Sequence, residues 1–429
     1  MRLDELLDEV ERDTEAERRR LAKERSYRVT EYLEDFERQF DAAVDGDALF
    51  GSTSPSIFVG RSNYPSVLTG VLSPVGNEEM ARDFVTDRTW YTQNFSIADV
   101  FQRRTAMLTA NQRVEVSAPS RQPKTPNVHD EWDGFLGVQR EVAIADRPVD
   151  VEIGLAERPE IDVSIDSIAN PTGPWARARS ADLAENPYVP RPIKKTLEDD
   201  DWRAEGAMTY LYRRDFDVYD IHRILSAGAL GEATERRLVP TRWSITAVDD
   251  TIGTYLRGGL RNAPSIDRVE VWRNSFIGNE YWVILAPGHW EYELIELKAP
   301  GSVWNPNPGD GMYIASDAEG FEGRTSYVEE TAGAYHAARL GVLETLADRG
   351  RQAKVLVIRH VSDDYWGPVG VWQVRESVRN AFEGEPGTAE SLGQAVLQLI
   401  PHLPVPFDDL RRSSELVAGT QSSLTHFEI

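Results

Sequence analysis

Three candidate strands follow one another in residues 267–299, "DRVEVWRNSFIGNEYWVILAPGHWEYELIELKA", and they indicate the fold class. The candidates are "DRVEVWRN", "EYWVILAP" and "WEYELIELKA". Their residues alternate in the way of strands that pack one face of a sheet against a core. The stretch therefore predicts an antiparallel meander.

Helices and a further strand follow this stretch. "SYVEETAGAYHAARLGVLETLADRG", residues 326–350, has the periodicity of an amphipathic helix and ends at Gly350, a residue type that favours the position after a helix. "AKVLVIRHV", residues 353–361, is typical of a buried strand, and helices are expected near 370–382 and 388–400. Together these patterns predict an α+β fold: a mixed, partly antiparallel sheet with several packed helices.

The first half of the chain also alternates between short strands and helices. "SIFVG" and "SVLTGVL" are predicted strands separated by "RSNYP", with Gly and Pro indicating tight turns. "LVPTRWSITAVDDTIGTYLRGGL", residues 238–260, predicts a strand or loop that runs into a helix, with Asp249 or Asp250 as its cap. Further helices are expected near 78–105 and 131–145.

Four regions are predicted along the chain. Residues 1–43 form a charged N-terminal helix, and residues 408–429 form a flexible, polar C-terminal tail. Between them, the Pro-rich connector "NPYVPRP" suggests a boundary that separates an N-terminal region, 44–190, from a C-terminal region, 191–407.

The composition bounds the class of protein. The 429 residues include 71 acidic and 47 basic residues, a formal net charge of −24, and only six of the basic residues are lysines. Two interpretations stay open: binding of cations or basic partners, and adaptation to a high-salt cytoplasm. The spread of acidic residues along the whole chain favours the second. Net charge therefore does not exclude nucleic-acid binding, which at high salt would depend on local arginine and on base stacking.

The sequence offers no local metal or cofactor motif. Cysteine is absent, which excludes disulfides, thiol catalysis and cysteine-ligated metals. The histidines show no tight ligand spacing, and no glycine-rich phosphate-binding motif follows a strand. No apolar run approaches the roughly 18 residues of a membrane span, and the start "MRLDELLDEVERD" is too charged for a secretory signal. We expect a cytoplasmic protein that uses no metal or cofactor and does not contact a membrane.

The segment "FVGRSNYP", residues 58–65, is the first candidate for a ligand site. Arg61, Asn63 and Tyr64 stand at the end of a predicted strand, where they could hold an anion or stack a base. A tight turn with a packed tyrosine explains the same residues equally well. Both interpretations stay open.

Two further segments extend this candidate site. In "VPTRWSITAVDD", Arg242 and Trp243 precede Asp249 and Asp250, a carboxylate pair suited to a cation or to acid–base chemistry, although helix capping explains it more simply. "PGHWEYELIELKAP" brings a histidine and a tryptophan to the start of a strand. Core packing accounts for most tryptophans, and the Tyr, His and Arg at 335, 336 and 339 are explained by a packed helix interface. The predicted cleft comprises Arg61, Asn63, Tyr64, Arg242, Trp243, Asp249, His289 and Trp290.

The blocks "IFVGRSNYP" (57–65), "LVPTRWSITAVDD" (238–250) and "QSSLTHF" (421–427) together resemble the archaeal Nre family of DNA repair proteins. The resemblance runs from about residue 50 to the end. It implies a DNA-damage-response protein that binds the sliding clamp PCNA through a C-terminal peptide. Some family members carry an N-terminal cysteine-rich zinc finger, which this cysteine-free chain does not share. The resemblance implies no catalytic residue.

The clamp-binding pattern is a Gln, two residues, an aliphatic residue, two residues and then aromatic residues. Gln421, Leu424 and Phe427 match it, whereas Glu428 stands where a second aromatic residue is usual. Residues three apart share one face of a helical turn, so Leu424 and Phe427 would insert together as hydrophobic anchors.

Two functional classes are therefore expected. The first is a repair factor tethered to PCNA whose body binds damaged or single-stranded DNA or another repair protein. The second is an enzyme that acts on nucleic acid or a nucleotide near Arg61, Arg242 and Asp249. Convergence of Arg61, Arg242 and His289 on one cleft with a carboxylate would favour the enzyme.

Overall fold

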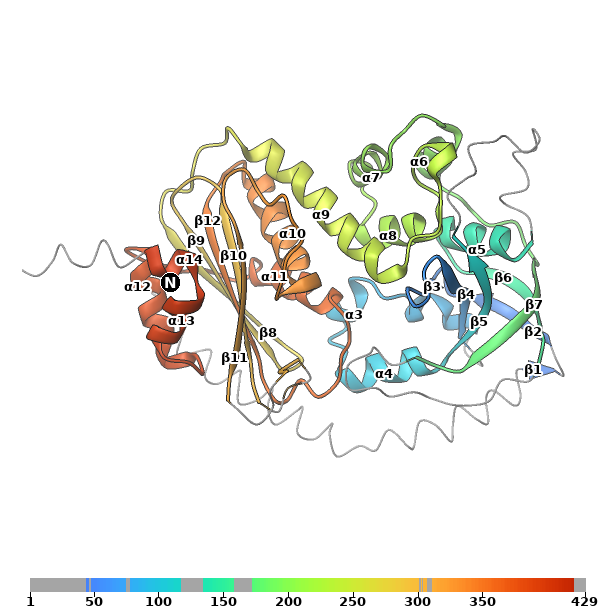
Figure 1. Ribbon diagram of the computed structural model, residues 1–429, viewed down its shortest axis with the longest axis horizontal. Helices are drawn as coiled ribbons and strands as arrows, with labels where there is room; N and C mark the ends of the chain where they lie inside the picture. The colour runs from blue at the N-terminus through green and yellow to red at the C-terminus, as the bar shows by residue number, and fades with distance from the viewer. Residues whose placement is uncertain are drawn as a thin grey trace, which may run out of the picture.

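The structure is a computed structural model of the chain, and it describes residues 44–45, 48–74, 78–116, 134–157, 172–300, 302, 304–306 and 311–419. The predicted charged helix at 1–43 and the predicted clamp-binding peptide at 421–428 lie outside the described residues. Figure 1 shows two lobes, each built around one sheet, with helices between them. Helices and mixed sheets of this kind confirm the predicted α+β class.

The first sheet is made of seven strands: β1 (Val44–Asp45), β2 (Ala48–Thr53), β3 (Ile57–Val59), β4 (Ser66–Pro74), β5 (Met107–Glu115), β6 (Val149–Leu155) and β7 (Trp175–Leu183). Their order in the sheet is β1-β2-β6-β7-β5-β4-β3. The predicted strands "SIFVG" and "SVLTGVL" are confirmed as β3 and β4, which pair antiparallel. β5 and β7 run parallel to each other, so the sheet is mixed.

The second sheet is made of six strands: β8 (Val269–Phe276), β9 (Asn279–Ala286), β10 (Glu291–Lys298), β11 (Tyr313–Glu319), β12 (Lys354–Val361) and β13 (Gly387–Ala389). Their order is β11-β10-β12-β9-β8-β13. β9 and β10 do not pair with each other, because β12 lies between them, antiparallel to β9 and parallel to β10. The predicted meander is thus correct for β8 and β9 and wrong for β10. The physical reason is that β12 is apolar and buried on both faces, which suits a central strand.

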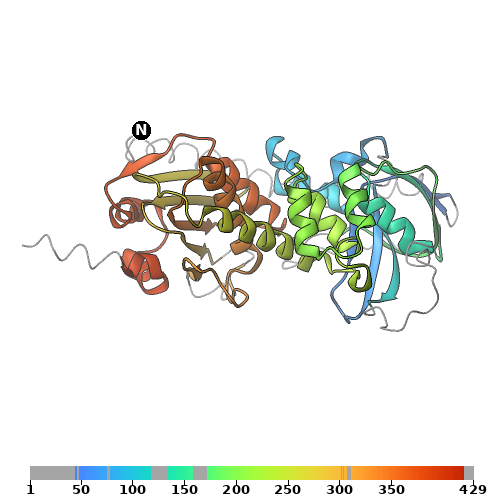
Figure 2. The same ribbon diagram turned by 90° about the horizontal axis from the view of Figure 1, so that it is seen from above.

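The helices of the first two thirds of the chain are η1 (Glu78–Phe84), α3 (Thr89–Thr92), α4 (Ile97–Thr105), α5 (Gly134–Ile144), α6 (Arg191–Glu198), α7 (Ala204–Tyr212), α8 (Val218–Ser226), η3 (Ala233–Glu235) and α9 (Thr241–Leu260). Figures 1 and 2 show α9 running from the first lobe to the second. None of the described helices combines the length and the apolar character that a membrane-crossing segment needs.

α9 begins earlier than the sequence suggested. The expected cap at Asp249 or Asp250 is wrong, because the helix starts at Thr241, directly after Pro240. Its buried stripe already begins at Ser244 and continues through Val248 and Ile252. Because the helix begins at Thr241, Asp249 and Asp250 lie more than two turns after its start, and neither residue can cap its N-terminus.

The last part of the chain contains α10 (Ala332–Arg349), α11 (Trp372–Ala381), α12 (Leu392–Leu399), η4 (Ile400–His402), α13 (Phe407–Ser413) and α14 (Glu415–Gly419). The predicted end of the long helix is confirmed, since Gly350 has the left-handed φ of 59°. α10 and α11 cover one face of the second sheet, and α12, α13 and α14 cover the other (Figure 1).

The flexible tail expected from residue 408 is wrong up to Gly419. α13 buries Leu410 and α14 buries Val417 against the second sheet. The Glu293 carboxylate on β10 accepts hydrogen bonds from the backbone N–H groups of Glu415 at 3.0 Å and Leu416 at 2.9 Å. Such a cap comes from a residue far away in the chain, so local sequence patterns do not reveal it.

Candidate functional site

Two exposed aromatic rings meet where the β3–β4 turn touches the start of α9. The Val59 N–H donates to Thr241 Oγ1 at 2.9 Å, which ties the end of β3 to the first residue of α9. The ring centroids of Tyr64 and Trp243 lie 5.3 Å apart, and the two residues are 41% and 46% exposed. The ring planes are tilted by 51°. We call this pair the aromatic platform, because exposed aromatic side chains suit the stacking of a nucleobase.

The turn before Tyr64 orients this ring. Asn63 has a φ of 62°, in the left-handed region that asparagine adopts more readily than most residues. The Ser66 N–H donates to the Asn63 carbonyl oxygen at 2.8 Å and closes the turn. A tight turn is therefore present, but its tyrosine is exposed rather than packed in the core.

Arg61 and Arg242 lie near each other, and Arg242 directly precedes Trp243 of the aromatic platform. Both are exposed, and within the described part of the chain neither guanidinium forms an ion pair. Burial lowers the pKa of Arg242, the charge of Arg61 lowers it further, and Tyr327 acts in the opposite direction. Arg61 and Tyr327 thus share the electrostatic surroundings of Arg242, and the surface carries positive charge beside accessible rings.

Tyr327 extends this surface toward α10. It is 59% exposed, and its ring stacks on that of His336 with a centroid distance of 5.5 Å. The loop that carries Tyr327 is anchored by Asp317 of β11, whose carboxylate accepts from the N–H groups of Glu330 and Thr331 at 3.0 and 2.8 Å. Tyr327 therefore projects from a fixed loop.

A carboxylate and two buried side chains lie beside Tyr327, between α9 and α10. Oδ1 of Asp250 is 3.4 Å from Nδ1 of His336 and 3.7 Å from Nη1 of Arg339. His336 and Arg339 are buried, whereas the Asp250 side chain is 54% exposed. The contact with His336 lowers the pKa of Asp250, burial opposes this, and Arg339 and Arg257 reinforce it. Asp250 is accordingly an ionised acceptor at the surface.

The predicted cleft needs correction at Asp249 and Trp290. Asp249 is 1% exposed and its Oδ2 lies 2.6 Å from Nη2 of Arg375 in the core. Trp290 is also 1% exposed, and its Nε1–H donates to Glu319 Oε1 at 2.8 Å. Both side chains are satisfied within the core and do not reach the aromatic platform.

His289 likewise lies away from the platform. Its ring packs against Phe321 at a centroid distance of 5.5 Å, and Phe321 in turn lies under Arg261 at 5.1 Å. Arg261 directly follows α9, whereas Arg242 is in its first turn. A helix of 20 residues is about 30 Å long, so His289 and Arg242 belong to opposite ends of α9.

Comparison with known proteins places the chain in a family. The family described as "Archaeal Nre, N-terminal" matches residues 21–305, and the one described as "Archaeal Nre, C-terminal" matches residues 319–427. The chain belongs to the archaeal Nre family. The resemblance seen in the sequence blocks is thereby confirmed.

Relatives of this Nre chain are found in two archaea. It is 66% identical to "DNA repair protein NreA" of Haloferax volcanii over the whole of both chains. It is 36% identical to "DNA repair protein NreA" of Archaeoglobus fulgidus over 80% of this chain and 82% of that one. "DNA repair protein NreB" of the same organism is 33% identical over 90% and 93% of the two chains. No solved structure matches.

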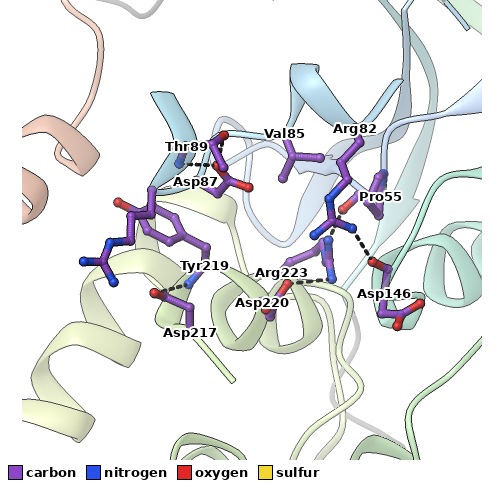
Figure 3. A pocket seen from close by; sticks show the side chains of 11 residues that line it. Pro55, Arg82, Val85, Asp87, Thr89, Asp146, Asp217, Tyr219, Asp220 and Arg223 are labelled. Atoms are coloured by element: carbon purple, nitrogen blue, oxygen red, sulfur yellow. Dashed lines mark hydrogen bonds and ion pairs between the residues drawn. The ribbon is translucent and has the colours of Figure 1, made fainter. Parts of the chain in front are cut away.

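This Nre protein also has a polar cavity of about 160 Å³ between the η1–α3 segment and α8 (Figure 3). Four aspartates and three arginines line it. Buried Arg223 donates to the carbonyl oxygens of Pro55 at 2.6 Å and Ala145 at 3.0 Å and pairs with Asp220 at 3.0 Å. The acidic excess does not suit a phosphate, and the bonds of Arg223 identify this place as a joint between α8 and the first lobe.

Sequence patterns missed the role of Tyr327 and of the α9–α10 contact. Tyr327 lies in the loop before α10, where no periodic pattern indicates whether a ring is exposed. Asp250 and Gly253 are three apart and so share one face of α9, but only the packed structure shows that this face meets His336 and Arg339. Among the described residues, no group of three His, Cys, Asp or Glu side chains could hold a metal ion.

Proposed function

We propose that this protein is a DNA repair factor whose body binds damaged or single-stranded DNA and whose C-terminal peptide tethers it to the sliding clamp PCNA. The observation that carries the DNA-binding part is the aromatic platform of Tyr64 and Trp243 together with Arg61 and Arg242, two neighbouring arginines that form no ion pair with any described residue. The relatives are named as DNA repair proteins, which supports a role in DNA repair.

The physical basis of this binding is stacking combined with local positive charge. Stacking of a base on an aromatic side chain contributes about 1–3 kcal/mol and tolerates any sequence, because every base has a π-face. Arg61 and Arg242 would contact phosphates next to the stacked base. Stacking is not screened by salt, so it persists in the high-salt cytoplasm that the composition suggests, whereas phosphate contacts weaken.

The clamp tether is supported by the peptide pattern and by its place in the chain. Gln421, Leu424 and Phe427 follow the clamp-binding pattern, with the departure at Glu428. Gln421 comes two residues after the end of α14, which is held on the second sheet by Glu293. If a peptide at this point binds the clamp, the folded body of the protein stays close to the clamp.

The enzyme alternative finds no support in the arrangement of the predicted residues. Arg61 and Arg242 lie together, but His289 is at the other end of α9 and Asp249 is buried with Arg375. Arg61, Arg242 and His289 therefore do not meet in one cleft with a carboxylate, which is the arrangement that the enzyme alternative required.

DNA binding is tested by fluorescence anisotropy with a labelled 12-nucleotide single strand in molar KCl. Tyr64→Ala with Trp243→Ala should weaken binding by at least roughly tenfold, because about 1–3 kcal/mol is lost per stacked base. The matched control is Tyr255→Ala, since Tyr255 is an exposed tyrosine of α9 with 40% exposure against 41% for Tyr64. Equal affinity of the double variant and the wild type would exclude the platform as the DNA site.

Clamp binding is tested by titration calorimetry with purified PCNA. Leu424→Ala with Phe427→Ala should remove measurable binding, because truncation of an interface anchor costs about 2 kcal/mol or more. Glu428→Phe should tighten binding by restoring the second aromatic residue. Unchanged affinity in the double variant would rule out the tether while leaving the DNA-binding part open to its own test.

A further inference from the structure

Asp250 is an acceptor that faces both the protein and the solvent. Its side chain is 54% exposed, whereas those of His336 and Arg339 are 8% and 2% exposed. Within the described residues, the two ring nitrogens of His336 have no hydrogen-bond partner, and Nη1 of Arg339 has none either. Nδ1 of His336 and Nη1 of Arg339 both face Oδ1 of Asp250, at 3.4 and 3.7 Å, while just over half of the Asp250 side chain is exposed to solvent.

The packing around Arg339 fixes this arrangement. Nε of Arg339 donates to Glu319 Oε1 at 2.7 Å, so the guanidinium is held from β11. Gly253 of α9 leaves room for it, since a Cβ at that position would lie 2.6 Å from Nη1. The guanidinium of Arg339 is therefore held in place beside Asp250 before any ligand arrives.

Tyr327 supplies a ring next to this carboxylate. One side of the ring stacks on His336 at 5.5 Å, and 59% of the residue stays exposed. Arg324 donates to the Tyr327 carbonyl oxygen at 3.3 Å, and Asp317 anchors the residues that follow. Tyr327 also lies within the electrostatic reach of Arg242. Tyr327 is therefore a neighbour of Arg242, which directly precedes Trp243 of the aromatic platform.

The hydrogen-bonding groups of Asp250 can distinguish among unpaired bases stacked on Tyr327. An ionised carboxylate offers two acceptor oxygens and no donor. On the Watson–Crick edge, guanine presents two adjacent donors, N1–H and the N2 amino group. Adenine and cytosine present one donor beside an acceptor nitrogen, and thymine presents one N–H between two carbonyl oxygens. Only guanine can satisfy both oxygens without placing a lone pair against the carboxylate.

We propose that Asp250 and Tyr327 form a receptor for an unpaired guanine in a DNA strand held on the aromatic platform. Asp250 accepts from N1–H and N2–H, Tyr327 stacks on the base, and the buried His336 and Arg339 act as positioning residues for the carboxylate. This inference rests on the proposed DNA-binding function and adds base selectivity to it.

The test compares anisotropy titrations of the full chain with four labelled strands of twelve nucleotides. One strand is all thymine, and the others carry a single central guanine, inosine or adenine. The guanine strand should bind the wild type roughly tenfold more tightly than the thymine strand, since a good two-bond base contact contributes about that much discrimination. Inosine lacks the N2 amino group, so it should lose most of this advantage without any change to the protein.

Variants locate the selectivity. Asp250→Asn should abolish the preference for the guanine strand, because the amide replaces one acceptor by a donor. Glu329→Gln is the matched control, as Glu329 is an exposed carboxylate on the Tyr327 loop, and it should keep the preference. Circular dichroism of Asp250→Asn checks that the fold is retained. If that variant does not fold, the inosine strand still tests, with the wild-type protein, whether the N2 amino group of guanine is recognised.

The outcomes separate the two proposals. Equal affinity for all four strands, or an inosine strand that binds as tightly as the guanine strand, would overturn the guanine receptor and leave the DNA-binding function intact. A guanine preference that survives Asp250→Asn in a folded protein would also overturn it. Absence of binding to every strand would overturn both proposals.

Discussion

Asp249 on α9 and Arg375 on α11 form a buried ion pair in which Oδ2 lies 2.6 Å from Nη2. Nη2 also lies 2.8 Å from Oδ1, so one guanidinium nitrogen contacts both carboxylate oxygens. Burial raises the pKa of Asp249, and Arg375 opposes that shift. The next residue, Asp250, points to the surface instead. Two adjacent aspartates therefore have different tasks: one holds two helices together, and the other is available to a ligand.

Asp249→Ala should lower the free energy of unfolding by about 3–5 kcal/mol, because it leaves the Arg375 charge buried without its partner. Denaturant titration of wild type and variant in molar KCl gives this difference. Arg261→Ala is the control, since it removes an ion pair with Glu322 whose side chains are 56% and 72% exposed, and such pairs contribute about 0–1 kcal/mol. Similar losses in the two variants would contradict the structural role of Asp249.

Two glycines of α9 should respond to alanine with opposite signs. Gly258→Ala should stabilise the protein by up to about 1 kcal/mol, because alanine favours a helix and no atom lies within 4 Å of the new Cβ. Gly253→Ala should destabilise it, because its Cβ would meet Nη1 of the buried Arg339 at 2.6 Å. Denaturant titration of both variants decides the matter, and stabilisation by Gly253→Ala would show that Arg339 moves freely.

Asp317 should make stability depend on acid pH. Burial alone would raise the pKa of Asp317, but hydrogen bonds from Glu329, Thr331 and Glu330 outweigh it and hold the pKa below its usual 3.8. A lowered folded-state pKa adds stability above 3.8 that is lost as pH falls through the folded-state value. The difference in unfolding free energy between wild type and Asp317→Asn should therefore be constant above about pH 5 and shrink below about pH 4. A difference that does not change with pH would contradict this.

Glu293 should control the attachment of α14. Glu293→Ala removes the acceptor of the Glu415 and Leu416 N–H groups and of the Ser414 hydroxyl, which donates at 2.8 Å. Buried donors without a partner cost about 1–3 kcal/mol each, so amide hydrogen exchange of residues 414–419 should become faster than in the wild type. Glu293→Gln keeps one acceptor oxygen and should fall between the two. Equal protection in all three proteins would show that apolar packing alone holds α14.

The candidate site was predictable only in part. Arg61, Tyr64, Arg242 and Trp243 stood out because arginines and aromatic residues occurred beside turns and helix starts, and the structure brings these four together. No sequence pattern indicates Tyr327, and Asp249, His289 and Trp290 do not reach the aromatic platform. Sequence alone does not tell a buried tryptophan from an exposed one, because both occur beside Gly and Pro and only the packing around them differs.

Local patterns in the sequence account for most of the individual helices and strands. The 3.6-residue period of α10 and its final Gly350, and the continuous apolar run of β12, follow from local interactions between near neighbours in the chain. How these elements pack against one another depends on long-range contacts. The tertiary structure places β12 between β9 and β10, caps α14 with Glu293, and sets Asp250 against His336 and Arg339. Such contacts join residues far apart in the chain, so their free energy depends on which surfaces become buried together, and no local pattern carries that information.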